Sequence, residues 1–178
     1  IYPYIYRKIN TINMKKFIYL SLTILLVSFT NGSNGISNPE SICDADNPVY
    51  IADNGITIKA KEWAKTGATG TIEDIIYTVV DEEMLREMLA NEKDVSTIAT
   101  TKVTDMSAMF YGAETFNQAI GNWDVTKVTT VRRMFYGATS FNQDLSAWDL
   151  DAVVDCAKFS YDTPQWNIPK PVFTNCKP

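Results

Sequence analysis

Two aspartates at equivalent positions are the first candidates for chemistry. Asp124 and Asp149 each follow a tryptophan, in two stretches of closely similar sequence. Paired carboxylates can act as general acid and base, which would make the chain a small exported hydrolase. Their equivalent settings instead favour a structural role in a repeated turn. We therefore predict that the protein is not an enzyme, with the hydrolase as the alternative.

The sequence contains no complete motif for a histidine-ligated metal or a calcium loop. The sequence contains no histidine, which excludes Ser-His-Asp and Cys-His nucleophile systems and histidine-ligated zinc or iron. Asp44, Asp46 and Asn47 have the spacing that opens a calcium loop, but the glycine and the distal glutamate of such a loop are missing. We interpret this stretch as a turn before Pro48 and predict no metal and no other cofactor.

The three cysteines are Cys43, Cys156 and Cys176. In an exported chain, an odd number suggests one disulfide and one free or intermolecular thiol. Cys156 and Cys176 both lie in the degenerate last repeat described below, so we predict that these two are paired. The alternative is that all three are small buried residues.

The segment that starts at Met14 has the layout of a secretory signal peptide. Two lysines precede an apolar run, Phe17–Phe29, and small polar residues follow. The run is shorter than the ~20 residues that span a bilayer, and a buried core segment is the alternative. We predict a signal peptide over residues 14–32, preceded by an untranslated segment over residues 1–13, and hence a secreted or cell-surface protein.

Charge narrows the class of partner. Four of the 16 basic residues and none of the 21 acidic ones lie in the first 32 positions, so the rest carries 12 basic and 21 acidic residues, a net charge of −9. Nucleic acids and anionic lipids both attract basic surfaces, so neither is the expected partner. We expect an extracellular protein or glycan. The remaining chain, about 145 residues, suits one domain.

The most specific feature is an internal repeat. Residues 103–127 align without a gap on residues 128–152, and a degenerate copy follows from Val153. The motifs MFYGA and FNQ each occur twice, at the same offset. A fixed period between roughly 20 and 50 residues is typical of stacked repeats, in which each copy covers the apolar face of the next.

Each repeat is predicted to contain a helix and a short strand. Apolar residues recur at helical spacing from Val103, Thr104 can cap the helix, and Gly112 stands where a left-handed residue would end it. The following FNQAI alternates as a strand does. Upstream, Asp53-Asn54-Gly55 predicts a β-hairpin, and GTIEDIIYTVV a further strand. Asp81 caps a predicted helix that we interpret as a degenerate first repeat.

Two stretches of the repeats are similar to the repeat of a known protein family. The stretches VTDMSAMFYGAETFNQAIGNWDV and MFYGATSFNQDLSAWDL resemble the repeat of the BspA-like leucine-rich-repeat surface proteins of bacteria, long catalogued as a domain of unknown function. The similarity runs from Val103 to about Tyr161, and the flanking segments resemble those that precede and close such repeats. It implies a secreted or surface-displayed protein that adheres to host proteins, matrix proteins or other cells, and it supplies no catalytic residue. Relatives often carry many more repeats and an anchoring domain.

We therefore predict an α+β fold, a short leucine-rich-repeat-like solenoid of 25-residue helix/strand rungs with an N-terminal β-hairpin cap. A β-rich cap is expected over residues 33–80, the repeat solenoid over 81–163 and a C-terminal cap over 164–178. The expected rungs are about 78–102, 103–127, 128–152 and 153–163.

The candidate binding face consists of positions that vary between the copies, since recognition can change there while the scaffold stays constant. The alternative is that these side chains are merely solvated. The candidates are Ser107, Ala108, Glu114, Arg132, Arg133 and Thr139. Asparagine also recurs at Asn117, Asn142 and Asn167, as either a ligand-binding stripe or an internal ladder of hydrogen bonds. We predict the ladder.

Overall fold

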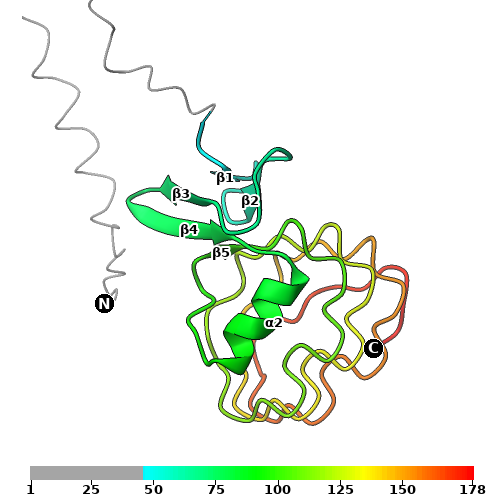
Figure 1. The fold of residues 1–178 in the computed structure, drawn as a ribbon. Coiled ribbons are helices and arrows are strands. Elements are labelled where there is room, and N and C mark those ends of the chain that lie inside the picture. Colours follow the sequence, from blue (N-terminus) through cyan, green and yellow to red (C-terminus); the bar gives the residue numbers. More distant parts are fainter. Residues whose placement is uncertain (1–45) are drawn as a thin grey trace, which may run out of the picture. The chain divides into compact units, whose positions relative to one another are not determined.

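The computed structural model describes residues 46–178 (Figure 1). The predicted signal peptide, the segment before it, Cys43 and Asp44 lie outside these residues. Within the described part the chain is α+β, with one helix and two small sheets.

The predicted β-hairpin at Asp53-Asn54-Gly55 is confirmed. Strand β1, Val49–Ile51, pairs antiparallel with β2, Ile58–Ala60. The Asn54 side chain accepts hydrogen bonds from the amides of Ile56 and Thr57, both at 3.0 Å. Gly55 follows with φ +70°, a conformation that costs glycine nothing. The asparagine and the glycine therefore turn the chain between the two strands.

The next segment was predicted to be one strand, and that prediction is wrong. The structure divides it into β3, Thr69–Ile72, and β4, Ile75–Val79, which pair antiparallel. Glu73 and Asp74 between them have φ +48° and +67°. Two successive left-handed residues make the tight turn that matches the twist of a hairpin. A third strand, β5 (Ile98–Ala99), pairs parallel with β4.

The predicted helix after Asp81 is confirmed as α2, Glu82–Ala90. The Asp81 side chain accepts a hydrogen bond from the amide of Met84 at 3.0 Å. This bond holds the pKa of Asp81 below its ordinary value, because it stabilises the ionised form. Leu85 is fully buried and joins the same apolar core as the repeats that follow.

The helices predicted within the repeats are absent, and residues 101–178 contain turns with no helix and no extended strand. Ala108 and Arg133, in the middle of the predicted helices, have φ +53° and +54°. A left-handed residue interrupts the helical path of an L-amino-acid chain. Phe110 shows where the backbone bonds go instead, because its amide donates to the carbonyl of Met134 at 2.8 Å, in the next copy.

Backbone hydrogen bonds join equivalent parts of successive copies. Four amides of the first copy donate to carbonyls of the second, and four amides of the second copy donate to the third, at 2.7–3.0 Å. Three bonds run the other way, from Thr129 to Thr104, from Ser140 to Glu114 and from Val154 to Thr129. The donors of the four-bond ladders are Met106, Ala108, Phe110 and Gly112, then Val131, Arg133, Phe135 and Gly137. Successive copies therefore lie side by side with equivalent residues adjacent (Figure 1).

Aromatic rings fill the space between the copies. Phe135 is fully buried, with its ring centroid 5.0 Å from Phe110 and 5.3 Å from Phe159. Trp123 stacks on Trp148 at 6.4 Å. Each copy thus supplies the surface on which the next one packs, as the repeat pattern predicts.

Candidate functional site

A column of tyrosines lies on the surface of the repeats. Tyr111, Tyr136 and Tyr161 stack with their centroids 5.0 and 4.9 Å apart and their rings within 12° and 22° of parallel. Tyr111 is 55% exposed and Tyr161 57%. Stacked rings cover each other's faces, so the row presents ring edges and hydroxyl groups, and only its two ends have a flat face without a tyrosine partner. We call these three residues the tyrosine row.

The tyrosine row extends between two hollows. A cavity of about 580 Å³ lies between α2 and the first copy, and Arg86, Leu89 and Tyr111 are among its lining residues. A second cavity of about 450 Å³ is lined by residues that include Lys158, Tyr161 and Lys177. Each end of the row therefore borders a cavity where a ligand could contact the outer ring.

Within the MFYGA motif, the tyrosine differs from the two residues before it. Met109 and Phe110 are buried, whereas Tyr111 points outward. The left-handed Ala108 and Gly112 on either side of these residues set which side chains face the core. Tyrosine at all three equivalent positions was the available signal, because a polar ring in a repeated exposed position marks a candidate for recognition.

The six candidate binding positions differ in their exposure and in their contacts with other copies. Ala108, Arg133 and Glu114 are exposed, while Ser107 is half-buried. Arg132 pairs with Asp155 of the third copy at 3.5 Å, and the Thr139 hydroxyl donates to the carbonyl of Glu114 at 3.3 Å. Arg132 and Thr139 therefore take part in contacts between copies.

Lys158 was missed, because only the two well-matched copies were compared. It occupies the position equivalent to Ala108 and Arg133. Its ammonium group lies 5.7 Å from the centre of the Tyr161 ring.

The repeated asparagines connect the copies. The amide of Asn142 donates to the side-chain oxygen of Asn117 at 2.9 Å, and the amide of Asn167 donates to that of Asn142 at 3.1 Å. The Gln143 side chain also donates to Asn117. These bonds use the asparagine oxygens within the protein.

The two candidate catalytic carboxylates differ in their surroundings, although both line a hollow of about 260 Å³. Asp124 is 1% exposed, and its oxygens accept from the Thr101 hydroxyl at 2.7 Å and the Thr126 hydroxyl at 2.6 Å. Lys59 lies 3.7 Å from the same carboxylate. Asp149 is exposed and accepts from the amide of Asp151 at 3.1 Å. Asp124 thus has the partners of a carboxylate that fixes a turn.

Replacing Asp124 with alanine should lower the free energy of unfolding by about 1–3 kcal/mol, because the buried hydroxyl of Thr101 loses its acceptor. Asp149→Ala, at the equivalent position, should cost less than about 1 kcal/mol, because water can replace its single bond. Urea unfolding of both variants measures the difference. Equal losses would contradict the structural role of Asp124.

Other turn carboxylates follow the same pattern. The Ser146 hydroxyl and amide donate to Asp144 and lower its pKa, and the Ser96 amide and hydroxyl lower the pKa of Asp94. In the stretch interpreted as a turn before Pro48, the Asn47 side chain donates to the carbonyl of Thr71 at 2.7 Å. Within residues 46–178, no group of three or more aspartate, glutamate or cysteine side chains is placed to hold a metal ion. The same residues contain no helix long and apolar enough to cross a membrane.

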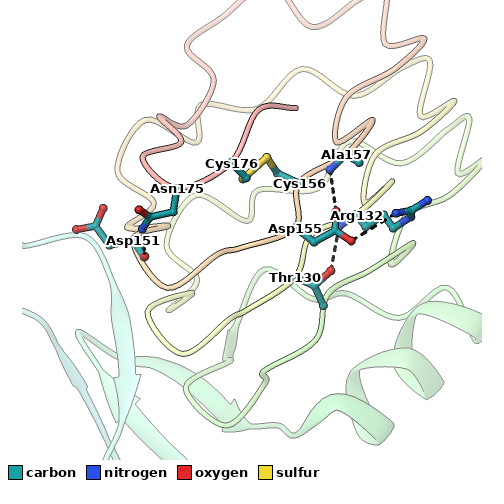
Figure 2. The surroundings of a disulfide bond; sticks show 8 residues. All are labelled: Thr130, Arg132, Asp151, Asp155, Cys156, Ala157, Asn175 and Cys176. Carbon is teal, nitrogen blue, oxygen red and sulfur yellow. Dashed lines mark hydrogen bonds and ion pairs between the residues drawn. A yellow bond between two sulfur atoms is a disulfide. The ribbon is translucent and has the colours of Figure 1, made fainter.

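A disulfide joins Cys156 to Cys176 across 20 residues, with a Cα–Cα distance of 5.9 Å (Figure 2). Cys156 is 1% exposed and belongs to the core. The neighbouring Asn175 side chain donates to the carbonyl of Asp151 at 2.6 Å. These contacts hold the C-terminal segment against the third copy through Cys156 and against the end of the second copy through Asp151.

Comparison with known sequences identifies a family. Residues 80–174 match the family described as "Mycoplasma protein of unknown function, DUF285". No curated protein and no solved structure matches the chain significantly. The matched residues include α2, all three copies and most of the C-terminal segment, which together make up more than half of the sequence. The chain therefore belongs to the DUF285 family.

Proposed function

We propose that the chain is an exported, non-catalytic binding module of the BspA-like repeat type, which adheres to extracellular protein or glycan. The observation that carries this proposal is the tyrosine row. Its rings are held in place by stacking and by the backbone ladders beneath them. Ordered aromatic side chains lose little conformational entropy on binding and dominate many interfaces.

In this proposal residues 81–163 form a short solenoid, with caps over residues 33–80 and 164–178. The support is the register of the contacts, since backbone amides of one copy meet carbonyls at the same offset in the next. The mixed core of Leu85, Val95 and Ile98 with the later copies supports a degenerate first rung that includes α2. Such a scaffold places equivalent side chains in rows, which suits recognition of an extended ligand.

A non-catalytic role fits the surroundings of Asp124, one of the two candidate catalytic carboxylates. Asp124 is buried with both oxygens hydrogen-bonded, so its acceptor sites are occupied by the protein. Export to the medium or to the cell surface fits the signal-peptide layout of residues 14–32. Together these features favour adhesion over the small hydrolase.

The tyrosine row is tested by binding to immobilised extracellular-matrix proteins and surface glycans. The protein should bind at least one of them, and Tyr111→Ala with Tyr136→Ala should weaken this binding at least tenfold, as loss of aromatic anchors does. Tyr50, which is 40% exposed on β1 and outside the row, provides the control Tyr50→Ala. Undiminished binding by the double variant, or hydrolysis of the bound ligand, would refute the proposal.

A further inference from the structure

The last copy ends in amides without acceptors. In the first two copies, the four equivalent amides donate to the following copy. In the third copy none of the four corresponding amides donates to a group of the described chain; Cys156 is buried and disulfide-bonded, which leaves those of Lys158, Ser160 and Asp162 for a ligand. The disulfide fastens the C-terminal segment beside this edge at Cys156. We call the backbone of Lys158, Ser160 and Asp162 the open edge.

The opposite end of the ladders is capped by a cation. The carbonyls of Asp105 and Ser107 accept from one guanidinium nitrogen of Arg86, at 3.4 and 3.2 Å. Arg86 stands one repeat length before Tyr111, and so takes the place of a tyrosine in the preceding copy. At the carbonyl end, two of the four equivalent carbonyls, those of Asp105 and Ser107, are thus already hydrogen-bonded, whereas the amides at the other end are not.

The ladders of backbone hydrogen bonds give the two ends of the row of copies opposite partial charges. In residues 106–112 and 131–137 the bonded peptide groups point their amides toward the last copy. Aligned peptide dipoles add, so the amide end is positive and the carbonyl end negative. The fewer bonds of opposite direction offset this sum only in part. Arg86 at the negative end fits this polarity, and the open edge should attract acceptors and anions.

Side chains increase the positive character of the open edge. Lys158, Ser160 and Lys177 line the cavity of about 450 Å³ beside it. Neither lysine has a carboxylate within ion-pair distance in the described part of the chain. A third cation, Lys170, lies 3.3 Å from the Ser160 hydroxyl. Asp162 is the acidic residue on the edge, so cations outnumber acids.

We propose that the open edge binds an extended acidic segment of another polypeptide, which takes the place of a fourth copy. Its carbonyls accept from the three unpaired amides, in the parallel direction of the bridges between Asp105, Thr130 and Asp155. Its carboxylates pair with the ammonium groups of Lys158 and Lys177. A second copy of this chain is disfavoured as the occupant, because Arg86 already covers carbonyls at its matching end.

This site adjoins the Tyr161 end of the tyrosine row, so its test follows the backbone amides of the edge with a different probe from the matrix-binding experiment. In a titration of isotope-labelled protein with a peptide of ten glutamates, the amide resonances of Lys158, Ser160 and Asp162 should shift. Those of Ala108 and Phe110, which are already bonded to the next copy, should stay in place.

Charge reversal supplies the second measurement. Lys158→Glu with Lys177→Glu should weaken peptide binding by about tenfold or more, because two ion pairs are replaced by repulsion. Lys65→Glu with Lys93→Glu makes the same change of charge at exposed lysines elsewhere and should leave binding unchanged. Thermal melting of both double variants shows that each is folded.

Three results would overturn the inference. The first is an absence of shifts at millimolar peptide. The second is a shift of these amides with heparin but not with the glutamate peptide, which would assign the edge to a sulfated glycan. The third is a shift that grows with protein concentration alone, which would assign it to self-association. All three results concern the open edge, and the proposed role of Tyr111 and Tyr136 is decided separately by the matrix-binding experiment with their alanine variants.

Discussion

Phe141→Ala should lower the free energy of unfolding by about 3–5 kcal/mol, the range for large core side chains reduced to alanine. Phe141 has no exposed surface, and its ring lies 4.2 Å from Phe135 and 4.7 Å from Trp166. Truncation therefore leaves a cavity between the second and third copies. For a domain with a total stability of about 5–15 kcal/mol, this is a large loss. Denaturant unfolding measures it directly.

Phe116 provides the matched comparison, because it holds the equivalent position in the first copy but is only partly buried. Phe116→Ala should cost about half as much, since less apolar surface leaves water in the folded state. The rings of Phe116 and Phe141 stack 6.0 Å apart, so the double variant should depart from additivity. Arg133→Ala on the surface should stay within about 0.5 kcal/mol. If Phe141→Ala proved equally mild, the packing of copy upon copy would be wrong.

Reduction of the Cys156–Cys176 disulfide should lower the free energy of unfolding by about 3 kcal/mol. The bond closes a loop of 20 residues, and restricting a loop of this size in the unfolded chain stabilises the folded state by that amount. Urea unfolding with and without reductant gives the difference. Cys156→Ala with Cys176→Ala should be destabilised to a similar or greater extent, because alanine also removes buried sulfur. An unchanged midpoint after verified reduction would show that the cross-link contributes nothing.

The repeat period was predictable from the sequence, and the local conformation within it was not. Val103, Met106 and Phe110 recur at helical spacing, and all three are buried. A backbone of successive tight turns also returns side chains to one face every three or four residues, so this spacing does not require a helix. The local conformation depends on where the backbone amides find hydrogen-bond acceptors, and in these repeats the acceptors include carbonyls of the next copy. A local pattern carries no information about such distant partners.

Residues other than glycine that adopt a left-handed backbone explain the other wrong predictions, such as the single strand that the structure divides into β3 and β4. Ala108, Arg133, Glu73 and Asp74 all have positive φ, a conformation that a sequence signals mainly by glycine and less strongly by asparagine or aspartate. The hairpin at Asp53-Asn54-Gly55 was predictable because its turn contains the expected residues. The outward direction of Tyr111 depends on the left-handed Ala108, so the three repeated tyrosines mark the positions of the row in the sequence but do not show that they face outward.

The fixed offset of the backbone ladders has a consequence for the gene. Every bonded amide of the ladder in residues 106–112 meets a carbonyl at one constant distance along the chain, as Met106 meets Thr130 and Phe110 meets Met134. Deleting residues 128–152 would place the third copy directly after the first and leave each of these amides opposite an equivalent carbonyl. Deleting one residue fewer would put every partner out of register. Unequal recombination between the similar copies can therefore lengthen or shorten the protein in whole repeats, while the capped first copy and the disulfide-bonded last copy stay unchanged.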